Sequence, residues 1–239
     1  MIAERMIAEN LESVRARIAV AARRAGRQPG DILLVAVSKG QPEEAVRAAY
    51  AAGQRDFGEN RVEDALDKIS RLRDLGEVRW HLIGHLQSRK VALAGTAFDL
   101  IHSIDRLKIA RRLSGLKAGR QQPILLEGNV SGEASKEGWP LSDRFGWEAI
   151  DQEVAEVTRL KGLELRGVMT IAPISTDEQL LRSVFRGLRE WRDHLRDRFS
   201  GEWPELSMGM TDDFEPAIEE GATIVRIGRA IFGPRLLDG

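Results

Sequence analysis

The amino-acid sequence predicts a single α/β barrel in which eight parallel strands alternate with helices. Short apolar runs recur along the chain, and segments with helical periodicity separate them. A length of 239 residues suits one such barrel, and no segment of the chain differs markedly in composition from the rest. We therefore interpret residues 1–239 as one domain.

An additional amphipathic helix precedes the first strand. Apolar residues recur at steps of three and four between Ile7 and Ala25, and arginines occupy the other faces. Gly26 and the Pro29-Gly30 pair are expected to end this helix.

The eight expected strands are short and apolar. Two of them, Arg55–Phe57 and Glu205–Met208, are too short for periodicity alone to establish. The full set is Ile32–Val37, Arg55–Phe57, Val78–Ile83, Phe98–Ile101, Ile124–Glu127, Leu163–Met169, Glu205–Met208 and Thr223–Ile227.

Helical segments fill the intervals, and strands that alternate with helices favour parallel pairing through crossovers. These segments are Pro42–Ala52, Asn60–Leu75, Leu86–Ala94, Asp105–Lys117, Ser142–Leu160, Thr176–Phe199 and Thr211–Glu220. A doubly wound open sheet is the alternative. The turn after the first strand, Val37–Pro42, has neither G-x-G-x-x-G nor G-x-x-x-x-G-K-[ST], which disfavours dinucleotide and nucleoside-triphosphate sites.

Composition narrows the class of function. Lys plus Arg (36) nearly balances Asp plus Glu (37), so the net charge of −1 provides no general attraction to nucleic acid or an anionic membrane. The absence of cysteine excludes disulfides and thiolate chemistry. No apolar run is long enough for a transmembrane helix, and charges interrupt the N-terminal segment, so we expect a cytoplasmic protein.

Lys39 directly follows the first apolar strand. In this fold, reactive groups lie at the carboxyl ends of the strands. A partly desolvated lysine amine at that position loses its proton more easily and can form a Schiff base. The alternative is a solvated lysine at the start of a loop.

The last two strands predict a phosphate site, since barrels often bind phosphate with the loops after strands seven and eight. Ser207–Thr211 follows strand seven, and Gly228 follows strand eight and allows close backbone approach. The simpler interpretation makes Thr211 a helix N-cap and Gly209 a turn residue. Arg226, inside an apolar strand, needs either an internal ion pair or a ligand.

The remaining polar candidates have structural interpretations. Asn60 suits the N-cap of the following helix. His81, His85 and His102 are not at metal-ligand spacing, and we expect no metal site. His194 lies in a charged helical stretch and is expected to face solvent.

Six segments of the sequence, in order and with shared spacing, resemble the pyridoxal-phosphate homeostasis protein family, whose barrel is similar to the N-terminal domain of alanine racemase. The segments are VAVSKGQP (Val35–Pro42), FGENRVED (Phe57–Asp64), WHLIGHLQSRK (Trp80–Lys90), HSID (His102–Asp105), GVMTIAP (Gly167–Pro173) and LSMGMTDDFEPAIEEGATIVRIGRAIFGPR (Leu206–Arg235). They cover nearly the whole chain.

The resemblance implies a pyridoxal 5′-phosphate site. Lys39 matches the Schiff-base lysine, Arg226 matches the arginine facing the pyridine nitrogen, and Ser207 is similar to a phosphate ligand. The other cofactor-binding residues implied are Asn60, His81, Ile83, Gly209, Met210, Ile227 and Gly228. The sequence departs from the family pattern at Arg89, where asparagine is expected, at Thr211, where serine is common, and at the variable position of His85.

Two classes of function follow from that resemblance. A racemase needs one acid–base group on each face of the substrate carbon. Lys39 can serve one face, but the single tyrosine, Tyr50, lies in the helix after strand one. His81 or His102 would have to replace it. An arginine opposite the ring nitrogen also weakens the ring as an electron sink.

We therefore expect a non-catalytic protein that buffers or delivers pyridoxal phosphate, with a pyridoxal-phosphate-dependent racemase as the alternative. An interaction scaffold with a vestigial site is a third class. Apo-enzymes that use the cofactor are the expected partners, and a monomer is the expected state.

Overall fold

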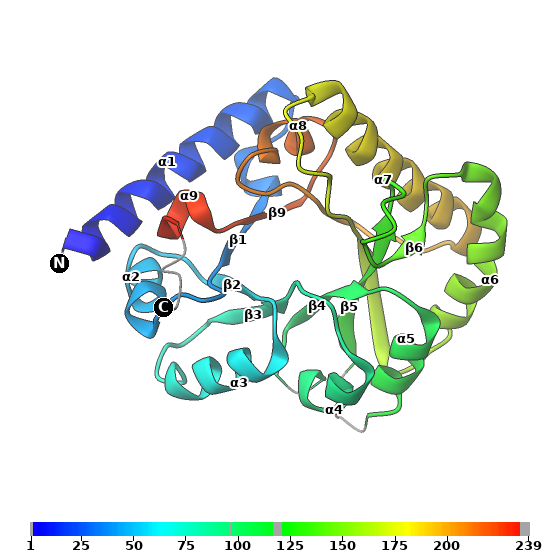
Figure 1. The fold of residues 1–239 in the computed structure, drawn as a ribbon, viewed down its shortest axis with the longest axis horizontal. Coiled ribbons are helices and arrows are strands. Elements are labelled where there is room, and N and C mark those ends of the chain that lie inside the picture. Colours follow the sequence, from blue (N-terminus) through cyan, green and yellow to red (C-terminus); the bar gives the residue numbers. More distant parts are fainter. Residues whose placement is uncertain (1, 96, 117–120, 235–239) are drawn as a thin grey trace.

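The computed structural model describes residues 2–95, 97–116 and 121–234; Lys117 and Arg235, which end two of the segments named above, lie outside these ranges. Its strands form a closed barrel, because β4 pairs with β5 and β1 pairs with β9. Figure 1 looks down this barrel. The barrel strands are β1 (Leu33–Val37), β2 (Asp56–Glu59), β3 (Arg79–Leu82), β4 (Leu100–Ile104), β5 (Gln122–Asn129), β7 (Leu163–Met169), β8 (Glu205–Ser207) and β9 (Ile224–Ile227).

All neighbouring strands pair in parallel, and β1 is in register with both of its neighbours. Leu33 lies opposite Ile224 of β9, and Ala36 lies opposite Phe57 of β2. Parallel strands place all their carboxyl ends at one mouth of the barrel. The expected fold class is confirmed, and the two predicted strands that periodicity alone could not establish are present as β2 and β8.

Helices surround the strands on the outside of the barrel (Figure 1). One of the two longest, α7, begins where Asp177 accepts hydrogen bonds from the backbone N–H groups of Gln179 and Leu180. The helices are α1 (Ile2–Arg24), α2 (Glu43–Ala51), α3 (Val62–Arg71), α4 (Val91–Ala94), α5 (Leu107–Ser114), α6 (Trp147–Val157), α7 (Glu178–Phe199), α8 (Phe214–Glu219) and α9 (Arg229–Phe232). No helix in the described ranges is long and apolar enough to cross a membrane.

The N-terminal helix α1 covers the seam where the first and last strands meet. It packs against α2, α8 and α9 through a buried stripe that includes Leu11, Val14 and Ile18. The side-chain amide of Asn10 donates to the carbonyl oxygen of Ile231 at 2.9 Å. The predicted extra helix is therefore confirmed, and it packs against helices from the first and the last strand–helix units of the barrel.

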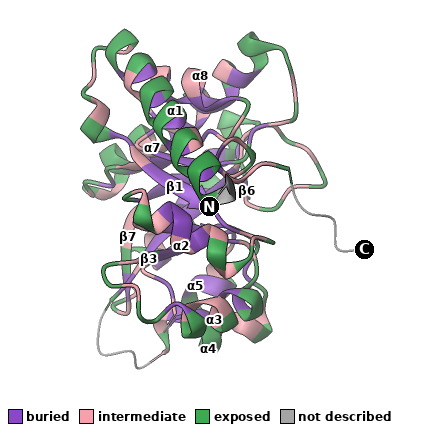
Figure 2. Ribbon diagram, turned by 90° about the vertical axis from the view of Figure 1, so that its left-hand side faces the viewer, coloured by how far each residue is buried: buried purple, intermediate pink, exposed green. Residues whose placement is uncertain are grey.

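The apolar core has two layers. The larger layer lies between the barrel and its helices, and Figure 2 shows buried strands inside a more exposed helical shell. A smaller cluster fills part of the barrel, with Val35, Leu100, Leu125, Met169 and Ile224 as its members. Buried polar side chains, including His81, His102, Ser207 and Arg226, share the barrel strands with this cluster.

Local structure differs from expectation around α4 and α8. The predicted helix Leu86–Ala94 is a 3₁₀ turn (Ser88–Lys90) followed by the short α4, because Gln87 has an extended backbone. The predicted N-cap Thr211 is not a cap. Asp213 occupies that position before α8, and its carboxylate accepts a hydrogen bond from the N–H of Met210 at 2.5 Å.

Two further expectations need correction. His194 is half-buried, because its ring packs on Trp147 and bonds to Asp151 at 2.9 Å. The loop after Glu127 begins later than expected, since β5 continues to Asn129, and a short strand, β6 (Trp139–Pro140), then pairs with β5.

Candidate functional site

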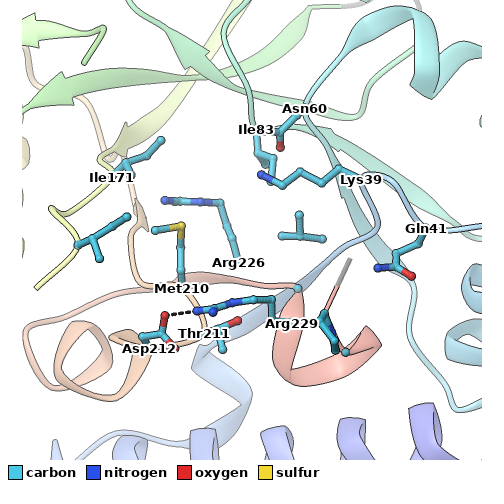
Figure 3. A pocket seen from close by; sticks show the side chains of 15 residues that line it. Lys39, Gln41, Asn60, Ile83, Ile171, Met210, Thr211, Asp212, Arg226 and Arg229 are labelled. Carbon is cyan, nitrogen blue, oxygen red and sulfur yellow. Dashed lines mark hydrogen bonds and ion pairs between the residues drawn. The ribbon is translucent and has the colours of Figure 1, made fainter. Parts of the chain in front are cut away.

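A cavity of about 560 Å³ opens at the carboxyl ends of the barrel strands (Figure 3). This volume is in the range of small-molecule and cofactor sites. Six of the ten predicted cofactor residues line it: Lys39, Asn60, Ile83, Met210, Arg226 and Gly228. The other four, His81, Ser207, Gly209 and Ile227, are buried and are not lining residues.

Lys39 and Asn60 bring polar groups to this cavity from the ends of β1 and β2. The Lys39 side chain is half-buried and extends toward Asn60 and Ile83 (Figure 3). The side-chain oxygen of Asn60 is buried and accepts no hydrogen bond from any described residue. Arg61 holds the N-cap position of α3 instead. Asn60 therefore has an acceptor available to a ligand with a hydrogen-bond donor.

Arg226 is a buried cation in the cavity wall, only 3% exposed. Its guanidinium donates to the Ser207 hydroxyl at 2.6 Å and to the carbonyl oxygen of Thr170 at 2.8 Å, and no carboxylate of the described residues forms an ion pair with it. Burial lowers the pKa of Arg226 to about 10, against the attraction of Asp213 and Glu127. The internal ion pair considered above is thus absent from the described structure.

A chain of hydrogen bonds continues from Arg226 through the barrel. Ser207 Oγ lies 2.8 Å from His102 Nδ1, His102 Nε2 lies 2.9 Å from His81 Nδ1, and His81 Nε2 lies 3.0 Å from Asp56 Oδ1. Burial, and then the charges of His81 and Arg226, hold the pKa of His102 well below its ordinary value. Burial opposes ionisation of Asp56, but hydrogen bonds, first from His81, keep its pKa below the ordinary value.

With both imidazoles neutral, only one direction satisfies every bond in this chain. His81 donates to the Asp56 carboxylate, His102 donates to His81, Ser207 donates to His102, and Arg226 donates to Ser207. The Ser207 hydroxyl and both histidine rings are therefore engaged beneath the cavity. The roles of Ser207 as a phosphate ligand and of His81 as a neighbour of the ring remain predictions.

The turn after β8 brings the backbone close to the cavity. Gly209 has a φ of +94°, and a Cβ atom there would lie 2.7 Å from the Cβ of Ala217 and 2.9 Å from the Cα of Phe214. The carbonyl of Gly209 accepts a hydrogen bond from the N–H of Arg226 at 3.0 Å. The turn therefore requires glycine and couples Met210 in the cavity wall to β9.

Replacing Gly209 with alanine is expected to lower the free energy of unfolding by roughly 1–3 kcal/mol, because the side chain would be strained and would overlap α8. Urea unfolding measures this change. Gly76→Ala is the matched control, since no atom lies within 4 Å of a Cβ there. Equal stability of the two variants would show that the turn tolerates a side chain.

Several cavity residues were not predicted. Arg229 and Asp212, paired with each other in the cavity wall, come from α9 and the β8 turn (Figure 3). Gln41 follows Lys39 closely in the sequence, and Thr211 appeared only as part of the phosphate loop. Ile171 and Ile174 form an exposed apolar lip at 37% and 105% exposure. Proximity to strand ends was the available signal for Gln41 and Arg229.

Glu127, near the end of β5, is a buried acidic residue that was also not predicted as part of the site. It is 7% exposed, and its carboxyl has no hydrogen bond or ion pair with any described residue. Burial, and then the negative charges of Asp105 and Glu137, together raise the pKa of Glu127 to about 7, although the charge of Arg226 opposes the shift.

Glu127→Gln should therefore stabilise the protein at alkaline but not acidic pH. A carboxyl whose pKa is raised on folding weakens the folded state as pH rises from about 4.5 to about 7, and the penalty is complete above that. Glutamine is neutral throughout. We expect a gain of roughly 3 kcal/mol at pH 8 and a small one at pH 4.5. Urea unfolding at both pH values tests this, and a gain independent of pH would contradict it.

Among the described residues, His85, Asp105 and Glu137 form a group whose ligand atoms lie within 4.8 Å of one another. Asp105 already pairs with Arg106, and His85 Nδ1 lies 3.2 Å from Asp105 Oδ2. A guanidinium on the same carboxylate opposes a divalent cation by charge. The expectation of no metal remains a prediction.

The closed barrel and its lysine-bearing cavity define a barrel of the alanine racemase N-terminal type. The family model for "Alanine racemase, N-terminal domain" matches residues 10–235. Alanine racemase from Corynebacterium glutamicum aligns with a TM-score of 0.65 at 18% identity, which shows a shared fold; the alignment covers 97% of this chain and 61% of that enzyme.

Nearer relatives identify the family. The pyridoxal phosphate homeostasis proteins of Pseudomonas aeruginosa and Escherichia coli K12 are 46% and 42% identical, over 96% of this chain and 96% and 97% of theirs. The PipY structure from Synechococcus elongatus with pyridoxal phosphate bound is 36% identical, with a TM-score of 0.83 over 95% of this chain and all of that one. The chain belongs to the pyridoxal phosphate homeostasis protein family, which confirms the resemblance stated above.

Proposed function

We propose that this protein reversibly holds pyridoxal 5′-phosphate in the large cavity, as a Schiff base on Lys39, and thereby buffers or delivers the cofactor in the cytoplasm. One observation carries the proposal: Lys39 and Arg226 line the same cavity at the carboxyl ends of the strands. The Synechococcus relative, solved with pyridoxal phosphate, supports the choice of ligand.

The residues of the cavity fit this cofactor. Lys39 offers an amine for an aldehyde, Arg226 offers a buried cation that holds its own proton, and the orphaned oxygen of Asn60 can accept a hydrogen bond. Thr211 and Arg229 bring a hydroxyl and a cation suited to phosphate. When bound, pyridoxal phosphate supplies a carbonyl carbon that primary amines occupy reversibly.

The cavity favours holding the cofactor over racemisation. Among the described residues, no tyrosine or histidine lines it. Both ring nitrogens of His81 and of His102 are engaged in the chain beneath. Tyr50 is at the C-terminal end of α2, which returns toward the amino ends of the strands. Among the described residues that line the larger cavity, no tyrosine or histidine is therefore placed to serve as a racemase's second acid–base group.

The test uses protein loaded with pyridoxal phosphate and freed of excess cofactor by gel filtration. Mixed with the apo form of a pyridoxal-phosphate-dependent enzyme, it should restore that enzyme's activity as the cofactor transfers. The same loaded protein should convert L-alanine to D-alanine far more slowly than about one turnover per second. Turnover at an ordinary enzymatic rate would favour the racemase, and absence of any bound cofactor would favour a scaffold. Light scattering tests the proposed monomer.

A further inference from the structure

A second cavity of about 250 Å³ lies beside the first and shares Asn60, Ile83 and Ile171 with it. Its remaining wall comes from the ends of β3 and β5 and from the loop after β5. The two cavities are therefore adjacent compartments of one mouth. A group bound in the smaller one would lie next to the contents of the larger one.

Two carboxylates, Glu127 and Glu137, line the smaller cavity, and neither has a hydrogen bond or ion pair with a described residue. Glu127 is also 93% buried, so water does not replace the missing partner fully. Beside it, the Oδ1 atom of Asp105 is buried without a hydrogen-bond partner among the described residues.

The cations near Glu127 are committed elsewhere. Lys136 pairs with Glu133 and donates to the Ser131 hydroxyl and to the carbonyl oxygen of Ile171. Arg226 donates to Ser207 and Thr170. The uncompensated charge of the cavity is therefore negative, and a bound cation with N–H donors would satisfy it.

The chemistry of the wall distinguishes an ammonium group from a metal ion. Among the described residues, the one group close enough to hold a metal ion includes the Asp105 carboxylate, which already carries the Arg106 guanidinium. An ammonium group needs only acceptors, and the Glu127 and Glu137 carboxylates supply them.

We infer that the smaller cavity binds the ammonium group of a primary amine and that Glu127 accepts a hydrogen bond, and then a proton, from it. The step is balanced: R–NH₃⁺ and the Glu127 carboxylate become R–NH₂ and the Glu127 carboxylic acid. The neutral amine has the lone pair that reacts with a carbonyl carbon. The inference rests on the proposed function, because it places an amine beside the cavity in which Lys39 would hold pyridoxal phosphate.

A carboxyl that titrates near neutral pH suits this exchange of protons. Asp105, Glu137 and Arg226 act on Glu127 by charge, and His85 and Lys136 also line the cavity. All of these groups remain in a Glu127→Gln variant. Any pH dependence that this variant loses is therefore due to Glu127 itself.

The test is calorimetric titration of the cofactor-free, full-length protein with n-butylamine, which carries a protonated primary amine. At pH 8 we expect saturable binding that Glu127→Gln weakens by about tenfold to a hundredfold, as for a lost hydrogen bond to a charged group. Glu148→Gln, an exposed position on α6, should bind like the unmodified protein. Affinity should also fall below pH 7 in the unmodified protein, and less so in Glu127→Gln.

Three results would overturn the inference. They are no saturable binding at pH 8, equal affinity in Glu127→Gln, and equal affinity for tetramethylammonium, which has no N–H donor. Displacement of n-butylamine by stoichiometric MgCl₂ at constant ionic strength would indicate a metal site instead. Because no cofactor is present, failure here is independent of whether Lys39 binds pyridoxal phosphate.

Discussion

Replacing Lys39 with alanine is expected to abolish the borohydride-trapped adduct between this protein and pyridoxal phosphate. Lys39 is the only lysine among the described residues that line the larger cavity, and its side chain extends into that space (Figure 3). The unmodified protein should develop a visible absorption band with the cofactor and lose it on reduction. Peptide mass spectrometry should then place the added mass on Lys39.

Lys136→Ala is the matched control, because Lys136 lines only the smaller cavity and bonds to Ser131, Glu133 and the carbonyl oxygen of Ile171. It should trap the cofactor as the unmodified protein does. If Lys39→Ala still forms the adduct, the covalent bond is on another lysine. If the unmodified protein and Lys136→Ala both fail to form the adduct, the cavity holds a different ligand and the proposed function fails.

Trp191→Ala is expected to lower the free energy of unfolding by about 3–5 kcal/mol, the usual cost of deleting a buried aromatic side chain. Trp191 is fully buried on α7, where its ring lies 6.5 Å from that of Trp139. For a protein of this size the melting temperature should fall by roughly 6–20 °C.

Phe145→Ala provides the comparison, since Phe145 is 95% exposed and should change stability by less than about 0.5 kcal/mol. Thermal and urea unfolding measure both variants. A loss below about 1 kcal/mol in Trp191→Ala would mean that the indole contributes little to packing. That result would be compatible with its buried ring N–H, which has no hydrogen-bond partner among the described residues.

Much of the fold could be predicted, because a barrel repeats one local pattern and most of its strands are marked by their own apolar runs. The pattern failed where single residues override it. Gln87 adopts an extended backbone inside an expected helix. Asp213 takes the N-cap position of α8 in place of Thr211, and its carboxylate accepts a hydrogen bond from the N–H of Met210 in the preceding turn. The periodicity of apolar residues indicates neither the extended backbone at residue 87 nor the later start of α8.

The site was predicted in part for the same reason. Lys39 could be found because it directly follows an apolar strand, and Arg226 because it is a charged residue inside one. The bond between His102 and Ser207 joins residues 105 positions apart, and no local signal indicates such a pair. Glu127 was read as the last residue of an apolar strand, so its position in a cavity required the closed barrel.

Closure between β1 and β9 has a consequence for synthesis of the chain on the ribosome. One edge of β1 stays without its partner until residues 224–227 have emerged, and α1 lacks α8 and α9 for the same period. Unpaired strand edges and uncovered apolar stripes are the surfaces through which nascent chains associate wrongly. Completion of the barrel is therefore a late event in translation, and chains truncated before β9 should aggregate.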